Sequence, residues 1–243
     1  MSVLTACSLG PTSYRDGLRL QEAVLEARAR GATGDWLLFP DHPPVLTVGR
    51  GASGDALRVD RAHLAARGIE LHEVSRGGDI TWHGPGQLVG YPIIDLGRCD
   101  RDLHRYLRAL EGSLIDALAS YGVHGERVAG RTGVWVDGEK IASIGIAVRK
   151  WVSYHGFALN VAPDLAAFDL IHPCGLRGIR MTSLAARLGE NTPVFAEVRD
   201  RVAGCLAARL DYEGVVWGDP GALPAPGLDS ATSSEPEEKS LAC

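Results

Sequence analysis

Two β-rich runs joined by an Asp-Gly pair place the strongest constraint on the fold of this 243-residue chain. The runs are residues 133–136 and 141–148, and Asp137-Gly138 lies between them. Such a pair between two runs is typical of a tight β-hairpin, whose strands are antiparallel. Apolar residues at three- and four-residue steps predict a long helix over residues 102–121. Hairpins mixed with helices predict an α/β (α+β) fold with mixed β-sheets and flanking helices, rather than a purely parallel sheet.

Capping and breaking residues locate the other predicted elements. Helices are predicted over residues 14–30 and 61–67 and after Thr192-Pro193, and strands over residues 36–39, 45–48, 69–74, 88–96 and 156–161. Two loops are predicted between them, over residues 76–87 and 163–180. After residue 217, Pro, Gly, Ser and Glu dominate and no aromatic residue occurs. We therefore predict one folded domain over residues 1–217 and a disordered tail over residues 218–243.

Composition narrows the class of protein. A formal net charge of −5 argues against a nucleic-acid-binding protein, which usually carries a basic surplus. The sequence has no apolar run of about 18 residues and no basic start before an apolar run, so neither a membrane span nor a signal peptide is expected. The five cysteines are widely spaced without a C-x-x-C pair, which favours reduced thiols in the cytoplasm over a zinc knuckle or redox pair.

The segment from Arg76 to Gln87 is the first candidate for a functional site. Its sequence, RGGDITWHGPGQ, contains four glycines, which allow the backbone to approach a ligand closely. Its polar side chains are suited to orienting a substrate group beside an apolar indole. The alternative is a structural connection whose glycines serve only turns. The segment is not a nucleotide-binding loop, because neither G-x-G-x-x-G nor G-x-x-x-x-G-K-[ST] is present.

Lys140 is the second candidate, because lysine is rare in this chain. Among 25 basic residues only Lys140, Lys150 and Lys239 are lysines. A desolvated lysine can exchange a proton whereas arginine cannot, so a lysine kept at the start of an apolar run indicates an acid/base role. The alternative is an ordinary solvated hairpin residue.

Cys174 is the third candidate, in the loop sequence His172-Pro-Cys-Gly. A loop cysteine close to a cation can become a reactive thiolate, and the alternative is an incidental loop residue. Cys7, Cys99 and Cys205 are interpreted as structural. His172 with Cys174 forms too small a set for a metal site, and none is expected. His83 and His155 remain possible bases, although a lone histidine is more often structural.

Taken together, these segments resemble the lipoyl/octanoyl transferase family within the biotin/lipoate protein ligase-like superfamily. The similar segments are residues 76–93, 138–145, 155–161 and 173–176, in one order along residues 10–210. The resemblance implies that residues 1–217 are a biotin/lipoate ligase-like catalytic domain. It implies Cys174 as the nucleophile that carries the acyl group as a thioester, and Lys140 as its partner that lowers the thiol pKa and shuttles protons. Trp82 is a departure, since the family often has tyrosine there.

The resemblance also implies an acyl-binding pocket built from three segments of the chain. Its residues would be Arg76, Gly77, Gly78, Asp79, Ile80, Thr81, Trp82, His83, Ser143, Ile144, Gly145, Gly156, Phe157 and Ala158.

The implied activity is transfer of an octanoyl group from acyl carrier protein to a lysine of lipoyl domains. The implied partners are octanoyl-acyl carrier protein, the lipoyl domains of 2-oxoacid dehydrogenases and the glycine cleavage H protein, with no nucleic acid and no membrane. No ATP and no metal are expected, because the acyl group arrives activated on the phosphopantetheine of the carrier. Both partners are acidic, so basic side chains are candidate docking charges. These are Arg127, Arg131, Arg149, Lys150, Arg177 and Arg180.

Three alternatives remain open. An ATP-dependent lipoate or biotin ligase on the same fold would not need Cys174. A non-catalytic module that binds lipoyl domains would need neither Cys174 nor Lys140. A cysteine hydrolase would differ only in admitting water to the acyl-enzyme.

Overall fold

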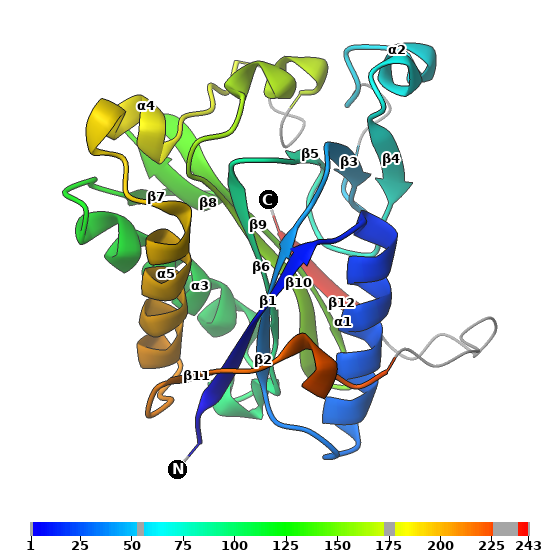
Figure 1. Ribbon diagram of the computed structural model, residues 1–243, viewed down its shortest axis with the longest axis vertical. Helices are drawn as coiled ribbons and strands as arrows, with labels where there is room; N and C mark the ends of the chain where they lie inside the picture. Colours follow the sequence, from blue (N-terminus) through cyan, green and yellow to red (C-terminus); the bar gives the residue numbers. More distant parts are fainter. Residues whose placement is uncertain (1, 53–55, 173–177, 226–237, 243) are drawn as a thin grey trace.

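The computed structural model describes residues 2–52, 56–172, 178–225 and 238–242, and nine strands among them form one mixed sheet (Figure 1). The strand order is β11-β1-β2-β6-β10-β9-β8-β7, with β12 also paired to β9. The pairs β11-β1 and β1-β2 are parallel, and every other pair in this sheet is antiparallel. The predicted mixed sheet with flanking helices is therefore confirmed.

The strands of the main sheet are β1 (Leu4–Pro11), β2 (Trp36–Asp41), β6 (Gln87–Ile93), β7 (Glu126–Val128), β8 (Arg131–Val136), β9 (Glu139–Arg149), β10 (Val152–Asn160), β11 (Val215–Trp217) and β12 (Glu238–Ala242). A second sheet contains β3 (Val45–Val48) between β4 (Glu70–Glu73) and β5 (Ile80–His83). The helices are α1 (Tyr14–Ala29), α2 (Arg61–Ala66), α3 (Leu103–Ala119), α4 (Leu184–Leu188) and α5 (Phe195–Arg209). Short 3-10 turns are η1 (Leu96–Cys99), η2 (Leu165–Leu170), η4 (Gly189–Asn191) and η5 (Pro220–Ala222).

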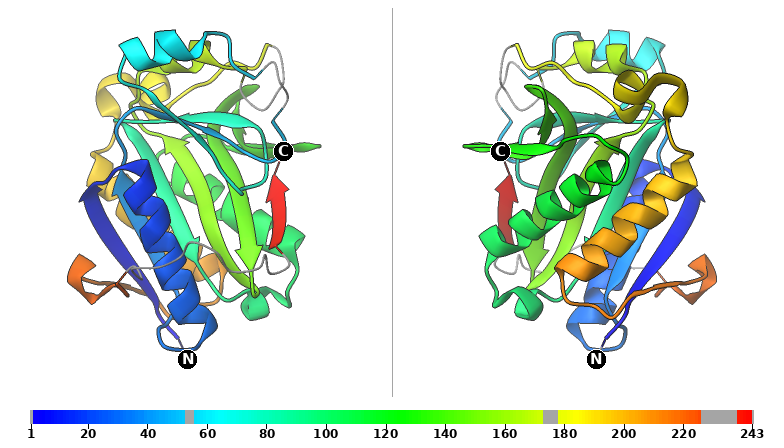
Figure 2. Two further views of the ribbon diagram at one scale, coloured as in Figure 1. Left: turned by 90° about the vertical axis from the view of Figure 1, so that its right-hand side faces the viewer. Right: turned by 90° about the vertical axis from the view of Figure 1, so that its left-hand side faces the viewer.

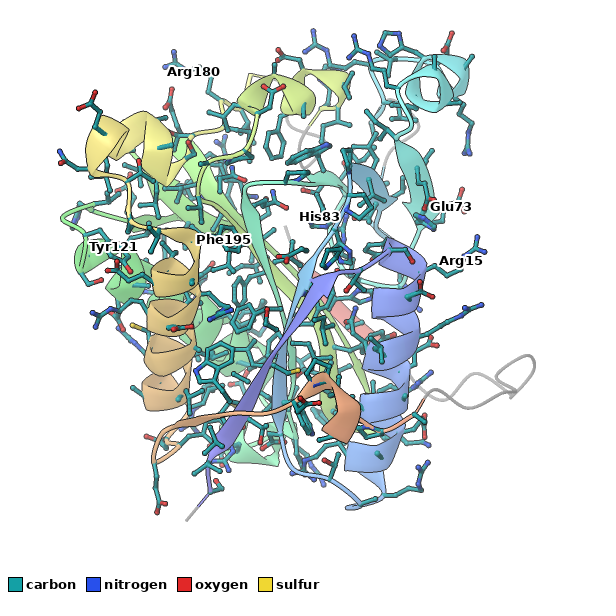
Figure 3. All side chains as sticks on the ribbon, in the orientation of Figure 1. Arg15, Glu73, His83, Tyr121, Arg180 and Phe195 are labelled. Atoms are coloured by element: carbon teal, nitrogen blue, oxygen red, sulfur yellow. The ribbon has the colours of Figure 1, made fainter. Side chains whose placement is uncertain are left out.

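Helices cover both faces of the main sheet (Figure 2). Helix α1 packs on one face, where Val24 and Leu25 meet the side chains of β2, β6 and β10. Helices α3 and α5 pack together on the other face and enclose the largest apolar core. Tyr121 after α3 and Phe195 at the start of α5 lie on this side of the molecule (Figure 3). None of the described helices is long and apolar enough to cross a membrane.

The three-stranded sheet lies above the main sheet with α2 and η2, and has its own small core. Trp82 belongs to this core, where its indole packs edge-on against Phe168 at 5.5 Å between ring centroids. Two main-chain hydrogen bonds hold the glycine-rich segment in place. The Gly77 N–H donates to Ile146 O of β9 at 2.9 Å, and the Arg50 N–H, just after β3, donates to Arg76 O at 3.1 Å. The second sheet therefore holds this segment over the face of the main sheet that α1 covers.

The structure differs from the predicted elements in several places. Strands β1 and β11 and helix α4 were not predicted, strand β5 lies inside the predicted loop 76–87, and η2 lies inside the predicted loop 163–180. Within the tail predicted to be disordered, residues 220–222 form η5 and residues 238–242 form β12, paired antiparallel with residues 145–149 of β9. Strand β12 forms by main-chain hydrogen bonds to the edge of β9, and such bonds do not depend on the composition that suggested disorder. The boundary between domain and tail at residue 217 stays a prediction.

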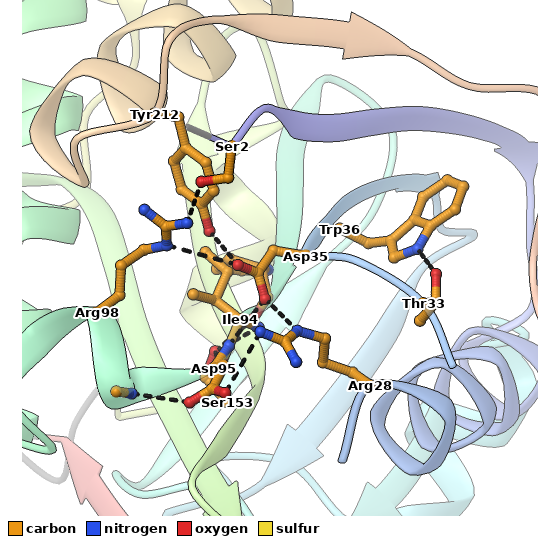
Figure 4. Close-up of polar contacts among 12 residues, drawn as sticks. Ser2, Arg28, Thr33, Asp35, Trp36, Ile94, Asp95, Arg98, Ser153 and Tyr212 are labelled. Atoms are coloured by element: carbon orange, nitrogen blue, oxygen red, sulfur yellow. Dashed lines mark hydrogen bonds and ion pairs between the residues drawn. The ribbon is translucent and has the colours of Figure 1, made fainter. Parts of the chain in front are cut away.

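A buried carboxylate joins the ends of several elements (Figure 4). Asp35, just before β2, accepts hydrogen bonds from Arg28 Nε at 2.6 Å and from Tyr212 Oη at 2.8 Å. It also accepts from the main-chain N–H of Asp95 at 3.0 Å, and Arg98 Nε lies at 3.5 Å. Because a buried charge is stable only when paired and hydrogen-bonded, this cluster fixes the end of α1 and the region after α5 to the main sheet.

Candidate functional site

An irregularity in β9 sets the direction of the Lys140 side chain. Val134 pairs with Ala142 but Trp135 pairs with Lys140, so Ile141 is an extra residue in β9, a β-bulge. Ile141 and Ala142 both pack in the core beneath α3. Lys140 therefore points to the opposite face of the sheet, where it lines a pocket, although its side chain is completely buried.

The space for the Lys140 side chain depends on Gly133 in β8. Gly133 has φ = 123°, and a Cβ atom there would lie 2.8 Å from Lys140 Cε and 3.4 Å from Nζ. The Nζ atom lies 5.5 Å from the centroid of the Trp135 ring. Any larger residue at position 133 would displace the Lys140 side chain. Glycine is therefore favoured there both because it has no side chain and because it adopts positive φ without strain.

Glu111 of α3 holds this part of β8 from below. Its carboxylate is buried and accepts a hydrogen bond from the Gly133 N–H at 3.1 Å. Arg127 Nε donates to the same carboxylate at 3.0 Å. A charge-assisted contact of this kind is stronger than a neutral hydrogen bond, so Glu111 is a positioning residue for the strand that shapes the Lys140 site.

The main chain of Lys140 is held by the segment that follows residues 173–177. Its N–H donates to Arg180 O at 2.9 Å, and its carbonyl accepts from Thr182 N–H at 2.9 Å. On the other side of residues 173–177, the N–H of His172 donates to Ala56 O at 2.9 Å. Cys174 itself lies outside the described residues; the main chain after residues 173–177 is hydrogen-bonded to Lys140, and the main chain before them is hydrogen-bonded to Ala56.

The pocket lies between the glycine-rich segment and the main sheet, on the side that α1 covers. Its cavity volume is about 40 Å³, well below the range of about 300–1,000 Å³ typical of small-molecule sites, so a ligand larger than a water molecule would have to displace lining side chains. It is lined by Tyr14, Arg76, Gly78, Asp79, Ile80, Thr81, His83, Tyr91, Lys140, Ser143, Ile144, Gly145, His155, Gly156, Phe157 and Ala158. Among the described residues, the structure thus brings together all those that the sequence predicted for the site except Gly77 and Trp82.

Small residues on the sheet side of the pocket allow neighbouring backbone to lie close against it. Gly145 of β9 pairs with Gly156 of β10, and Ser143 pairs with Ala158. A Cβ atom on Gly145 would lie only 2.8 Å from the carbonyl oxygen of Gly77. Gly77 does not line the pocket, but its carbonyl determines how little room residue 145 has.

Arg76 fastens the glycine-rich segment to the second sheet. The guanidinium is buried, and Nη2 donates to Thr47 O at 2.7 Å and to Thr47 Oγ1 at 2.9 Å. Burial of a cation is tolerated here because these oxygens accept its hydrogen bonds. Trp82 in contrast belongs to the core of the second sheet and is not among the pocket-lining residues.

Tyrosine and histidine side chains form the polar part of the pocket wall. Burial, together with the neighbouring His42, lowers the pKa of His83 to about 3. Burial and the Arg76 cation lower the pKa of His155 to about 3. Burial raises the pKa of Tyr14 to about 12. These three groups are therefore neutral at neutral pH, and they contribute dipoles to a wall that also contains Arg76, Asp79 and Lys140.

His155 has an unusual backbone within β10. Its φ is 56°, and its N–H donates to Gln21 Oε1 of α1 at 2.7 Å. A non-glycine residue with positive φ inside a strand costs about 1–3 kcal/mol, and such residues cluster at functional sites. Here the kink turns His155 into the pocket beside Gly156.

Sequence reasoning assigned no pocket role to Tyr14 or Tyr91. Tyr91 alternates with Val89 and Ile93 in β6, a period-two signal that its side chain shares their face. Its hydroxyl contacts His42 Nε2 at 2.7 Å, while His42 Nδ1 contacts the carbonyl of Thr12 at 2.8 Å. No local signal identifies Tyr14, which reaches the pocket from the first turn of α1.

The described cysteines fit structural roles. Cys7 and Cys99 are buried and Cys205 is partly buried. Burial raises the pKa of each of these thiols, which disfavours the reactive thiolate.

Most of the predicted docking charges already have partners within the chain. Arg127 pairs with Glu111, Arg149 and Lys150 pair with Glu26, and Arg180 pairs with Glu139. Arg131 lies over the Trp135 ring, and Arg177 is outside the described residues. Arg180 lies at the outer rim of the molecule (Figure 3), so its charge faces solvent.

The chain matches the family described as Lipoyl protein ligase A/B catalytic domain over residues 13–207. It is 50% identical to an octanoyltransferase from Geobacter metallireducens over 203 residues, which cover 84% of this chain and 92% of the relative. It is 45% identical to an octanoyltransferase from Chloroflexus aggregans over 218 residues, covering 88% and 98% of the two chains.

Solved structures of low sequence identity share the fold. Lipoate-protein ligase A bound with ATP has a TM-score of 0.69 at 18% identity, with 90% of this chain and 88% of the other covered. A bi-partite lipoate protein ligase from Thermoplasma acidophilum, solved in a study of that ligase and its E2 lipoyl domain, has a TM-score of 0.68 at 17% identity, with 90% and 87% covered.

Proposed function

Because the chain belongs to the lipoyl protein ligase A/B catalytic domain family, we propose that it is an octanoyltransferase. It transfers an octanoyl group from acyl carrier protein to the lysine amine of lipoyl domains in 2-oxoacid dehydrogenases and the glycine cleavage H protein, the first step of endogenous protein lipoylation. The observation that carries the proposal is Lys140, a fully buried lysine that lines a pocket together with the predicted acyl-binding residues and whose main chain is hydrogen-bonded to the segment that follows residues 173–177. The high identity to octanoyltransferases along most of the chain supports the same activity.

In the first half of the reaction, the Cys174 thiolate attacks the thioester carbon of octanoyl-acyl carrier protein. A cationic Lys140 favours the thiolate by charge. The new C–S bond to Cys174 forms as the C–S bond to phosphopantetheine breaks, and Lys140 protonates the departing sulfur. Lys140 is left neutral, beside an acyl-thioester on Cys174.

In the second half, the neutral amine of the acceptor lysine attacks the acyl-enzyme. The C–N bond forms, the C–S bond breaks with its electron pair moving to Cys174, and neutral Lys140 takes the amine proton. This restores the initial thiolate and lysinium. Thioester-to-thioester exchange is nearly isoenergetic and thioester-to-amide conversion is downhill, so the sequence of steps needs no ATP and no metal.

The sheet side of the pocket carries only small side chains, which is compatible with an unbranched acyl chain. Gly145 pairs with Gly156 and Ser143 pairs with Ala158, so the methylene groups of an acyl chain would leave water along this side once the lining side chains move. Each buried methylene contributes about 0.8 kcal/mol. The neutral side chains of Tyr14, His83 and His155 provide polar groups that can orient a carrier-bound acyl group.

The principal alternative is an ATP-dependent ligase, because the neighbour bound with ATP has this fold. The test is a transfer assay with octanoyl-acyl carrier protein and an unmodified lipoyl domain, with and without ATP, read as the mass of the lipoyl domain. We expect a gain of one octanoyl group that does not depend on ATP. Transfer that requires free octanoate and ATP would instead identify a ligase.

Variants separate the proposed roles of the two central residues. Cys174→Ala should abolish transfer, and Lys140→Arg should abolish it although the positive charge is kept, because arginine does not exchange a proton. Cys205→Ala is the control and should affect mainly stability. Full activity of Lys140→Arg would remove the proton-shuttling role.

A further inference from the structure

A chain of buried hydrogen bonds connects the pocket to the segment that holds Lys140. His83 Nδ1 lies 2.8 Å from Gln87 Oε1, and Gln87 Nε2 donates to Asn160 Oδ1 at 3.0 Å. Asn160 Nδ2 then donates to the carbonyl oxygen of Thr182 at 2.9 Å. The N–H of Thr182 in turn donates to the Lys140 carbonyl at 2.9 Å. All five residues are buried, so solvent does not compete for these contacts.

The carbonyl group of Thr182, near one end of this hydrogen-bond network, determines the direction of the side-chain hydrogen bonds in it. The carbonyl of Thr182 can only accept, so Asn160 must present its NH₂ group there and its Oδ1 to Gln87. Gln87 must then donate through Nε2, which leaves its Oε1 facing His83. An amide oxygen only accepts, so His83 Nδ1 must carry the hydrogen. The tautomer of His83 is thus set three contacts away, and Nε2 is the unprotonated ring nitrogen.

We propose that Gln87 and Asn160 are positioning residues that hold His83 as the Nδ1-H tautomer, so that Nε2 accepts a hydrogen bond from the incoming lysine amine. This inference rests on the proposed octanoyl transfer. His83 lines the pocket beside Lys140, and with Nδ1 bonded to Gln87 its remaining ring nitrogen is the one available to a substrate.

The chemistry of the two half-reactions indicates that this acceptor serves the second. A thioester has no N–H or O–H to donate, and the developing oxyanion and departing thiolate of the first half both need donors. The nearest phosphopantetheine N–H is separated from the sulfur by two methylene groups, so only the acceptor lysine brings N–H groups to the reacting atoms, and its lone pair must point at the thioester carbon when it attacks. A fixed acceptor for one N–H orients that lone pair.

His83 orients the amine without becoming its base. Burial lowers the pKa of His83 to about 3, so the imidazole does not keep a proton at neutral pH. As the C–N bond forms and the C–S bond breaks, the electron pair moves to Cys174 Sγ and the amine proton moves to Lys140 Nζ. Thr182 connects the group that orients the amine with the group that takes its proton. Its carbonyl accepts a hydrogen bond from the Asn160 amide, and its N–H donates one to the Lys140 carbonyl.

The tautomer is read directly by long-range ¹H–¹⁵N correlation spectra of the imidazole rings in the full-length protein, with His83 assigned by comparison with His83→Asn. We expect a protonated Nδ1 and an unprotonated Nε2 in the wild type at pH 7. A protonated Nε2 would overturn the inference. This readout does not depend on transfer, so it stands apart from any failure of the proposed function.

Single-turnover mass spectrometry gives the kinetic test, with acyl-enzyme formation and its discharge to a lipoyl domain measured separately. Gln87→Leu should slow discharge about tenfold, as expected for the loss of one well-placed hydrogen bond, and leave acylation nearly unchanged. Asn160→Leu should act in the same direction.

The control is Tyr106→Phe, which removes another buried hydrogen bond, from Tyr106 Oη to Ser153 Oγ, on the α3 side of the sheet. It should leave both steps unchanged. Equal slowing of acylation and discharge in Gln87→Leu, or no slowing of discharge, would overturn the inference. Failure of the wild type to form an acyl-enzyme would instead overturn the proposed function.

Discussion

Replacing Lys140 with methionine should abolish transfer and at the same time stabilise the protein. Methionine has a similar length and no charge, so Lys140→Met removes the ammonium while filling its space. The side chain is completely buried, and an ion in that position has lost its hydration. A stable structure that keeps such a group does so for its chemistry.

The magnitude follows from the contacts of Lys140. Replacing a buried ion by an apolar side chain of similar volume is neutral or stabilising by about 1–4 kcal/mol. The Trp135 ring lies 5.5 Å from Nζ, and loss of this cation–π contact offsets about 0.5–2 kcal/mol. The proposed partner, the Cys174 thiolate, takes up a proton when the cation is removed, so this partner is not left as an unpaired buried charge. We expect a net gain of about 1 kcal/mol, which raises Tm by about 2–4 °C.

Thermal and urea unfolding of the full chain measure this gain, and the transfer assay measures the loss of activity, expected to be at least about 100-fold. Lys150→Met is the matched control for stability. Its side chain is half exposed and its Nζ lies 3.0 Å from Glu26 Oε2. Losing an exposed ion pair costs at most about 1 kcal/mol, so the two lysines should change stability in opposite directions.

Two results would refute this reasoning. A loss of about 3 kcal/mol or more in Lys140→Met, the size expected when a buried pair is broken, would mean that Lys140 is a structural ion. Transfer within tenfold of the wild type would mean that Lys140 has no chemical role.

Acid should destabilise the protein, because His83 and His155 have folded-state pKa values of about 3. These lie below the unfolded value of about 6.5, so stability is fully present above that pH and is lost as pH falls, by about 1.4 kcal/mol per histidine between pH 7.5 and 5.5. Urea unfolding at the two pH values measures this, and an unchanged free energy of unfolding would contradict the buried neutral state. Asp35→Asn should lower the free energy of unfolding by about 2–4 kcal/mol yet leave transfer per folded molecule unchanged; a selective loss of transfer would place Asp35 in the chemistry. Gly145→Val should slow acyl-enzyme formation at least tenfold, about 1.4 kcal/mol, since its Cβ would lie 2.8 Å from Gly77 O, and normal acylation kinetics would place the acyl chain elsewhere.

The elements that depend mainly on neighbouring residues were the ones that the sequence predicted. The Asp-Gly turn and the spacing of apolar residues located the β8-β9 hairpin and α3, because turn geometry and helical periodicity are properties of neighbouring residues. Strand β1 was not predicted. Its sequence, LTACSLGP, has no alternation of β-branched residues, and it is ordered by parallel pairing with β2 and with the distant β11. Pairing between residues so far apart in the chain has no local signal.

In the candidate site, too, local signals identified a residue, while its orientation depends on pairing between strands. The rarity of lysine pointed to Lys140, but not to its direction. Strict alternation would place Lys140 on the face of Ala142 and Ile144, in the core under α3. The extra residue Ile141 moves it to the pocket, and a β-bulge depends on the register with the partner strand rather than on local composition.

The measurement that tests the proposed mechanism most directly is intact-protein mass spectrometry of the chain after mixing with octanoyl-acyl carrier protein, without ATP, beside Cys174→Ala. We predict a gain of one octanoyl group in the wild type, released by hydroxylamine as a thioester is, and no gain in the variant. An adduct that persists in Cys174→Ala, or its absence from folded wild-type protein with a competent donor, would contradict an acyl-enzyme on Cys174.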